Sequence, residues 1–362
     1  MDIKQLEDLI LQARKAYYNL DPIMSDSEYD ALIDKLNSLN PKSDNITQVG
    51  YPIDRSVGGW KKQKHKIMMG SLNKVNLESE FVDWVGINSH SDLLITHKLD
   101  GSSLELVYFG GKLKSCVTRG DGIVGEDITP NGALIPTIPK TISYDGDLFV
   151  RGEVVIYKQT FNDIYGSQYS NPRNAANGKM KNYHDPSGCK HLTFVAYTIM
   201  GIDGVNYENQ VFETLKGLGF VIPDYHVGDV KSVIEWHNKC MENRDSIPYM
   251  IDGTVIRINN MQVQRDMGDK NMRPVGQIAW KPESKSKTTE IVDVEWNVGS
   301  TGRITPVAIV KPVEIDGVTI TRVSLHNIKM FKSLQLKKSD IVIVTRRNDV
   351  IPYLTKPQME VQ

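Results

Sequence analysis

Short apolar runs separated by Gly, Asp and Asn turns fill the middle of this 362-residue chain, and they limit its fold more than any other feature. Between residues 92 and 285 the runs are LLITHKL, SLELVYF, DLFVRGEVVIY, LTFVAYTI, GTVIRI and QIAWK. Two helical stretches, near 208–218 and 229–243, interrupt them. Because the runs do not alternate regularly with helices, the pattern predicts an α+β domain with antiparallel sheets.

The two ends of the chain differ from this middle part. Apolar residues three or four apart, beginning with Ile3, Leu6 and Leu9, predict a helical hairpin within residues 1–40, and residues 41–70 are polar and irregular. After about residue 287 only short strands follow, which is typical of a small barrel such as an OB-fold. The expected domains are a helical one at 1–68, the mixed one at 69–286 and an all-β one at 287–362.

Composition argues against several classes of protein. No stretch approaches the ~20 apolar residues of a membrane span, and the N-terminus has no apolar signal core. The cysteines Cys116, Cys189 and Cys240 form no CxxC pair, which argues against a disulfide framework or a zinc site. The net charge is −1, yet residues 281–362 carry 13 Lys and Arg against 9 Asp and Glu. We therefore expect a protein of a reducing compartment, the cytoplasm, with its positive charge gathered at the C-terminal end.

The tetrapeptide Lys98-Leu99-Asp100-Gly101 ends an apolar run and is the first candidate for chemistry. Taken alone, it is typical of an exposed turn. In a functional site Lys98 would be a nucleophile, which requires an unprotonated amine although the reference pKa of lysine is ~10.4. Neighbouring cations and partial burial lower that pKa, so such a site needs other basic residues around it.

Charged residues accompany several other apolar runs in the same way. They are Arg119 in RGDG, Arg151 and Glu153 in RGE, Arg173 in NPRNAANG, Asp252 and Arg257 in DGTVIR, and Lys281 in AWKP. Each one alone is typical of a turn or of a solvated strand end. Together they form an ordered series along the chain.

This ordered series resembles the nucleotidyltransferase core of the bacterial NAD-dependent DNA ligases. The resemblance runs from about residue 4 to residue 354, and is strongest in KLDG, TRGDGIVGEDIT, VRGEV, NPRNAANG, DGTVIR and VGSTGRITPVAIVKPV. It implies an ATP-grasp-like ligase domain between a small helical domain and an OB-fold. The implied reaction seals nicks between a 5′-phosphate and a 3′-hydroxyl in duplex DNA through a lysyl-AMP intermediate.

The resemblance also implies roles for the residues that match the family's motifs. Lys98 would attack the adenylyl phosphorus of NAD, Asp100 would organise the site around it, and Lys281 would contact the α-phosphate. Glu153 would bind the adenylate ribose and help to organise Mg²⁺, and Asp252 would support the metal or the phosphate. The implied cofactors are NAD and Mg²⁺, without zinc.

Further contacts to nucleotide and DNA follow from the same resemblance. Tyr197 would stack on adenine, with simple core packing as the alternative, and Ser71 and Leu72 lie in the segment that approaches the adenosine. Arg119 would bind the ribose or the nick phosphate. The residues expected to bind the nicked duplex are Arg119, Arg173, Lys179, Arg346 and Arg347. We expect DNA binding through phosphates, and therefore sensitivity to salt.

In the N-terminal hairpin, the family's nicotinamide mononucleotide site is matched by Tyr17, Asp26, Tyr29 and Asp30. The implied roles are stacking on the nicotinamide ring and binding of its amide or ribose hydroxyls. Packing of Tyr29 inside the hairpin is the alternative. Because ATP-dependent ligases lack this unit, its presence favours NAD over ATP.

Three positions depart from the family pattern. Thr96 replaces a glutamate that reads adenine, Arg257 replaces a lysine, and Tyr18 replaces a histidine of the nicotinamide site. The hydroxyl of Thr96 can still form a hydrogen bond, and the guanidinium of Arg257 keeps the charge of lysine although it is a planar fork. We therefore still expect both residues to contact the cofactor. Two alternatives stay open: a catalytically impaired nick-binding subunit, and an ATP-using nucleic-acid ligase of the same superfamily.

The family continues after the OB-fold with a four-cysteine zinc finger, helix-hairpin-helix repeats and often a BRCT domain, whereas this sequence ends at Gln362. Three explanations stay open. The sequence is a piece of a longer ligase, or a compact natural ligase, or one part of a ligase whose other domains lie on a second chain. Apart from such a second chain, we expect a monomer.

Overall fold

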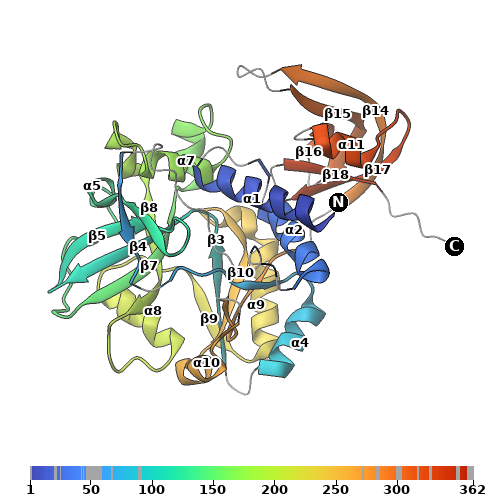
Figure 1. The fold of residues 1–362 in the computed structure, drawn as a ribbon. Helices are drawn as coiled ribbons and strands as arrows, with labels where there is room; N and C mark the ends of the chain where they lie inside the picture. The colour runs from blue at the N-terminus through green and yellow to red at the C-terminus, as the bar shows by residue number, and fades with distance from the viewer. Residues whose placement is uncertain are drawn as a thin grey trace. The chain divides into compact units, whose positions relative to one another are not determined.

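The computed structural model describes residues 2–19, 23–24, 26–41, 43, 45, 59–66, 68–88, 92–270, 273–282, 286–298, 304–315, 318–325, 328–347 and 351–356. The chain divides into two compact units, residues 49–282 and residues 1–48 with 283–362 (Figure 1). Within the described ranges no helix is both long and apolar enough to span a membrane.

Two β-sheets form the frame of the 49–282 unit. The first sheet has the order β1 (Lys61–Lys64), β6 (Val124–Asp127), β5 (Lys112–Thr118), β4 (Ser102–Phe109), β7 (Leu148–Val155), β8 (Thr193–Met200). The second has the order β2 (Asn73–Val75), β13 (Gln277–Trp280), β10 (Ile251–Ile258), β3 (Leu93–Leu99), β9 (Tyr225–Gly228). Neighbouring strands are antiparallel except for β2 and β13, which are parallel. The predicted α+β class is confirmed.

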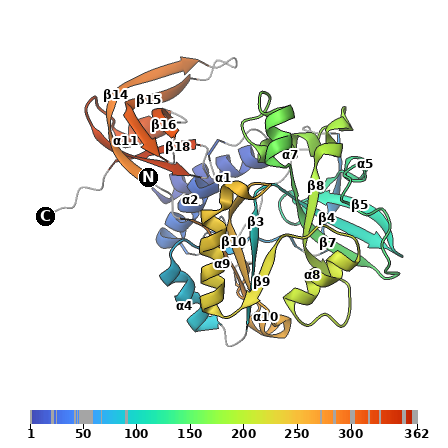
Figure 2. The ribbon, with the colours of Figure 1, turned by 180° about the vertical axis from the view of Figure 1, so that it is seen from behind.

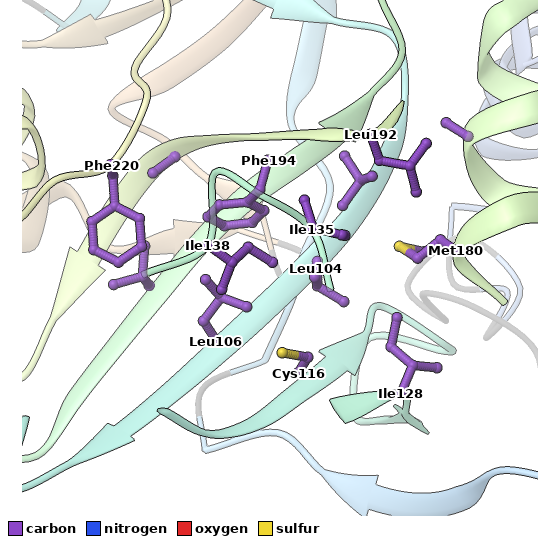
Figure 3. Close-up of a cluster of buried hydrophobic side chains, with 14 of the residues drawn as sticks. Leu104, Leu106, Cys116, Ile128, Ile135, Ile138, Met180, Leu192, Phe194 and Phe220 are labelled. Carbon is purple, nitrogen blue, oxygen red and sulfur yellow. The ribbon is translucent and has the colours of Figure 1, made fainter. Parts of the chain in front are cut away.

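One face of the first sheet packs into the largest hydrophobic core. Alternate residues of β4, Leu104 and Leu106, lie fully buried against Ile138 and Phe194, as Figure 3 shows. Residues from α7 (Pro172–Met180) and α8 (Glu208–Gly217) line this core, and α5 (Thr129–Gly132) contacts β5 of the same sheet. Because strand side chains alternate between faces, the intervening residues of β4 and β7 point to the opposite, polar face: Ser103, Glu105, Arg151 and Glu153.

The second sheet alternates in the same way. Leu93 and Ile95 of β3 pack with Ile256 of β10 against α4 (Glu78–Asn88) and α9 (Val230–Glu242). Figure 2 shows α9 lying over β3 and β10. The other face of these strands carries Thr96, Lys98 and Arg257. Each sheet therefore has one apolar face covered by helices and one face with polar side chains.

Only Asp100 and Gly101 separate β3 of the second sheet from β4 of the first. The crossing is narrow, because a Cβ atom added to Gly101 would lie 2.2 Å from the carbonyl oxygen of Val154. A real Cβ never approaches an oxygen so closely, so only glycine fits there. The KLDG motif is therefore the joint between the two sheets.

In the other unit, the N-terminal hairpin consists of α1 (Ile3–Asn19) and α2 (Asp26–Leu39), as predicted. Its core is formed by Leu6, Ile10, Ile33 and Leu36. The C-terminal strands have the order β16 (Val318–Ser324), β15 (Ile304–Ile315), β14 (Ser286–Val298), β17 (Ile341–Arg347), β18 (Ile351–Thr355), with α11 (Ile328–Leu334) between β16 and β17 in sequence. The edge strands β16 and β18 contact each other, so this sheet curls into the predicted small barrel.

One expectation about local structure is wrong. Residues 41–70 are not irregular throughout, because Lys61–Lys64 form β1 and pair with β6 in the first sheet. Lys62 donates to Glu126 at 3.0 Å, and Gln63 donates to Ser115 at 2.8 Å. A strand made only of Lys and Gln carries no apolar alternation, so pattern analysis does not detect it.

Substituting Gly101 tests the narrow joint. We expect Gly101→Ala to destabilise the 49–282 unit by about 1–3 kcal/mol, the usual effect of overpacking, because a backbone carbonyl cannot turn aside as a side chain can. Urea unfolding measures the change. Gly86→Ala on α4 is the matched control, since its added Cβ would have no atom within 4 Å and alanine favours helix. Equal stabilities of the two variants would contradict this account of the joint.

Candidate functional site

The carboxylate of Asp252 joins two lysines on the polar face of the second sheet. Lys98 Nζ lies 2.7 Å from Asp252 Oδ1 and 2.8 Å from Oδ2. Lys281, which follows β13, places its Nζ 3.3 Å from Oδ2. The three side chains come from β3, β10 and the end of β13, which are neighbours in the sheet. The structure thus brings together three residues predicted from separate motifs.

An irregularity in β10 directs Asp252 toward Lys98. Ile251 pairs with Leu99, but Thr254 pairs with His97, so Asp252 and Gly253 lie in a bulge at the level of Lys98. Burial alone would raise the pKa of Asp252, but the positive charges of Lys98 and Lys281 outweigh it and lower this pKa to about 2. Asp252 is therefore ionised at neutral pH and holds both ammonium groups.

Asp100 and Arg173 form a second ion pair beside the joint, with Arg173 Nη1 2.9 Å from Asp100 Oδ1. Arg173 lies in the first turn of α7, which begins at Pro172 and is capped by the Asn171 side chain, the acceptor of the Asn174 N–H. The free N–H groups of a helix N-terminus favour anions. This end of α7 therefore combines a guanidinium with a favourable helix dipole.

On the first sheet, Glu153 of β7 lies opposite Ser103 of β4 and accepts a hydrogen bond of 2.8 Å from its hydroxyl. Burial raises the pKa of Glu153 from its ordinary value of 4.5 to about 7. Tyr197 occupies a bulge of β8 and belongs to none of the apolar clusters of the described chain. Burial, and then the charge of Glu153, raise the pKa of Tyr197 to about 12.

Arg119 follows β5 and reaches the segment predicted to approach a nucleoside. Its Nη2 donates to Ser71 Oγ at 2.9 Å and its Nε to the Met69 carbonyl at 3.3 Å, whereas Leu72 is partly exposed. His65 was not predicted, yet its Nε2 donates to the carbonyls of Thr118 and Arg119, both at 3.1 Å. Its other nitrogen, Nδ1, lies 2.7 Å from the carboxylate of buried Glu105. His65 thus fixes the backbone at Thr118 and Arg119, from which the Arg119 side chain extends.

Thr96 and Arg257 also share the polar face of the second sheet. Arg257 Nη1 donates to Thr96 Oγ1 at 3.3 Å, and its Nε lies 3.9 Å from an oxygen of Glu208, the first residue of α8. Burial lowers the pKa of Arg257, although Glu208 opposes the shift. Glu208 was not predicted, because it lies far from every motif in sequence.

Other predicted residues lie apart from this group or beyond the described side chains. Lys179 of α7 places its Nζ over the rings of Tyr165 and Tyr169, at 5.1 and 5.6 Å from their centroids. Tyr29 packs against the apolar cluster of the hairpin, which agrees with the structural alternative for that residue. The structure describes the backbone but not the side chains of Tyr17, Asp26, Asp30, Arg346 and Arg347.

Metal ligands and thiols were sought in the same described ranges. No group of three or more His, Cys, Asp or Glu side chains there could hold a metal ion by itself. Cys116, Cys189 and Cys240 are buried free thiols, and burial raises the pKa of all three. Inert thiols of this kind are typical of packed cores.

Two kinds of comparison with known proteins, by domain family and by similarity over the whole chain, both find DNA ligases. Residues 57–285 match the NAD-dependent DNA ligase adenylation domain, and residues 288–362 match the NAD-dependent DNA ligase OB-fold domain. A DNA ligase of Sorangium cellulosum is 38% identical over 97% of this chain and 56% of its own length. A DNA ligase of Campylobacter jejuni is 37% identical over 94% of this chain and 56% of its own length.

The chain thus spans about half the length of the curated relatives it matches. A distant structural likeness is that to the Chlorella virus DNA ligase-adenylate, with 12% identity and a TM-score of 0.34 over 80% of this chain and 99% of that one. The two domain matches together cover most of the sequence and include each motif of the site. The chain belongs to the NAD-dependent DNA ligase family.

Proposed function

We propose that this chain is the adenylyl-transfer core of an NAD-dependent DNA ligase, which seals nicks between a 5′-phosphate and a 3′-hydroxyl in duplex DNA. The observation that carries the proposal is the pairing of Lys98 and Lys281 on Asp252, beside the joint of the two sheets. Family membership supports it, as do relatives named DNA ligase at 34–38% identity. A nick-binding subunit without activity would not need a nucleophilic lysine and a second lysine converging on one carboxylate.

In the first step, the Lys98 amine attacks the α-phosphorus of NAD and forms a P–N bond. The P–O bond to nicotinamide mononucleotide breaks, and its electron pair leaves with that phosphate. The amine must first lose a proton to water, because Asp252, at 2.7 and 2.8 Å, binds the ammonium form and its pKa of about 2 makes it too weak a base to keep the proton. Lys281 then offsets the negative charge that develops on the phosphoryl oxygens.

In the next two steps, AMP passes from Lys98 to the 5′-phosphate of the nick, and the 3′-hydroxyl then displaces AMP. Each step needs cations placed around the transferred phosphate. We assign this role to two guanidinium groups: that of Arg173, at the N-terminus of α7, which pairs with Asp100 of the KLDG joint, and that of Arg119, which follows β5. Lys179, Arg346 and Arg347 would add contacts to the duplex backbone, which make binding salt-sensitive and independent of sequence.

Mg²⁺ is the metal that the family implies, and the donor set allows a test of fit. Mg²⁺ sites usually combine one or two carboxylates with waters and substrate phosphates, not a cage of protein ligands. Both oxygens of Asp252 already lie near ammonium groups, whereas Glu153 accepts only one described hydrogen bond, from Ser103. Glu153 is therefore the better ligand for the metal. Asp252 would act indirectly, by holding Lys98 and Lys281 in place. When bound, Mg²⁺ would neutralise charge on the transferred phosphate.

We assign the nicotinamide mononucleotide half of NAD to the N-terminal hairpin, through Tyr17, Asp26, Tyr29 and Asp30. The adenosine half would lie between the polar faces of the two sheets, with its base near Tyr197, Thr96 and Arg257, and with Ser71 and Leu72 at its edge. An ATP-using ligase is the second candidate, and the choice of nucleotide in the assays below distinguishes the two. We further propose that the protein acts in the cytoplasm, and as a monomer unless a second chain supplies further domains.

Mass spectrometry of the intact protein tests the nucleophile. After incubation with NAD and Mg²⁺ we expect a gain of one adenylyl group, which is absent in Lys98→Ala. Lys281→Ala should slow the gain about 100-fold or more, the usual effect of removing one preorganised charge-stabilising donor. Lys231→Ala, at an exposed position of α9, is the matched control and should react like the wild type. If neither NAD nor ATP adenylylates the wild type, the proposed activity is wrong.

The pKa of Glu153 predicts how stability depends on pH in the absence of nucleotide and metal. Since this pKa rises from 4.5 to about 7 on folding, the folded state keeps a proton that the unfolded state loses, and its stabilising effect is lost as the pH rises through 7. Each pKa unit corresponds to about 1.4 kcal/mol. Glu153→Gln should therefore gain stability relative to the wild type between pH 5 and pH 8.5.

Thermal unfolding of both proteins across that pH range measures the effect. Glu235→Gln, at an exposed position of α9, controls for the loss of one negative charge. A difference between wild type and Glu153→Gln that does not change with pH would mean that Glu153 titrates as an exposed carboxyl does.

Variants of the hairpin test the choice of NAD. Asp26→Ala and Tyr29→Ala should each slow adenylylation by NAD about tenfold or more, the loss expected for one hydrogen bond to a ligand. They should still transfer AMP from a pre-adenylated enzyme to a nick, because that step does not involve nicotinamide. Asp8→Ala, exposed on α1, is the control. Wild-type rates with NAD in both variants would disprove the assignment of the hairpin.

A further inference from the structure

A buried polar cluster lies on the same face of the second sheet as Lys98. It consists of Thr96 on β3, Arg257 on β10, Glu208 at the start of α8 and Gln264 on α10 (Met261–Met267), and we call it the Arg257 cluster. Thr96 is 1% exposed, Arg257 5% and Glu208 6%. Thr96 precedes Lys98 by two residues in a strand, so both side chains point to the same side.

Backbone and side-chain bonds hold Glu208 firmly in this cluster. Its N–H donates to the carbonyl of Asn259 at 2.8 Å, which ties the first turn of α8 to the end of β10. Gln264 Nε2 donates to Glu208 Oε1 at 2.7 Å and to the Ile258 carbonyl at 2.7 Å. Gln277 in turn donates to Gln264 at 2.9 Å. These contacts determine where the carboxylate of Glu208 lies.

Arg257, in contrast, is held in place but incompletely bonded. Its guanidinium lies over the ring of Phe212, with Cζ 5.8 Å from the centroid. Nη1 reaches Thr96 at the long distance of 3.3 Å, and Nε is buried without a hydrogen-bond partner among the described residues. Glu208 is 3.9 Å away, too far for a hydrogen bond, so it orients the charge without occupying the donors.

We propose that Glu208 is a positioning residue that holds the plane of Arg257, so that Arg257 and Thr96 present hydrogen-bonding groups to the edge of the purine base in the adenosine site. This inference rests on the proposed function and deepens it. Arg–carboxylate pairs are frequently close and bidentate. Here Gln264 bonds the Glu208 carboxylate, which stays 3.9 Å from Arg257 Nε, and Nε has no hydrogen-bond partner among the described residues. An acceptor atom at the edge of a planar ring would supply a hydrogen-bond partner for the guanidinium of Arg257.

Discrimination between two dinucleotides tests this role. Nicotinamide hypoxanthine dinucleotide differs from NAD at the base edge, where an oxo group replaces the 6-amino group. We expect Glu208→Gln to raise the KM for NAD in self-adenylylation about tenfold, a change of about 1.4 kcal/mol, with kcat changed less than threefold. The ratio of kcat/KM for NAD to that for the hypoxanthine analogue should fall by a similar factor. Glu213→Gln, exposed on the same helix, is the matched control and should leave both values unchanged.

A double-mutant cycle shows whether Glu208 acts through Arg257. In an Arg257→Lys background, the added Glu208→Gln change should have little further effect on the ratio, because the fork it orients is gone. If Glu208→Gln does not fold, as judged by circular dichroism, Gln264→Met replaces it. That variant removes the bond that holds Glu208 and should lower the ratio in the same direction.

Two results separate this inference from the proposed function. An unchanged ratio in a folded, fully adenylylated Glu208→Gln protein would overturn the role of Glu208 and leave the ligase proposal intact. A wild type that no dinucleotide adenylylates would overturn both. A full effect of Glu208→Gln in the Arg257→Lys background would also contradict the inference, since Glu208 would then act on the site by another route.

Discussion

The negative charge of Asp252 is the constraint on which the site depends. Lys98 and Lys281 are 183 positions apart in sequence, and without an ionised carboxylate between them their ammonium groups would repel each other on one sheet face. The bulge at Asp252 and Gly253 provides that carboxylate at the level of Lys98. Cations on both sides of the carboxylate keep its pKa low, so the arrangement persists over the physiological pH range.

The architecture of the 49–282 unit keeps the face that carries Asp252 polar and the opposite face of the same sheet apolar. Each sheet buries one face under helices and leaves the other with charged or hydroxyl side chains. The joint at Asp100 and Gly101 brings the two kinds of polar residue into one fold: cations and Asp252 on the second sheet, and Glu153, Ser103 and Tyr197 on the first. In the proposed reaction, one sheet would handle the phosphate and both would hold the nucleoside.

Strong apolar alternation and ordered motifs made most of the strands and many of the site residues predictable from the sequence. The strands that carry Lys98, Glu153 and Asp252 begin and end within a residue or two of the predicted runs. The resemblance pointed to Lys98, Asp252 and Lys281 one by one, but not to the pairing of the two lysines with Asp252. The polar strand β1 was missed because it lacks apolar alternation. His65, Glu105 and Glu208 were missed because their roles arise from contacts between residues distant in sequence, such as Glu208 and Arg257, which no local pattern encodes.

A crystal structure of the full chain after incubation with NAD and Mg²⁺ would show whether Lys98 carries the adenylyl group. We expect electron density for AMP that is continuous with Lys98 Nζ, with Lys281 on its phosphate and the purine edge facing Arg257 and Thr96. Nucleotide density elsewhere, or an unmodified Lys98 still paired with Asp252 although NAD has been consumed, would contradict this expectation.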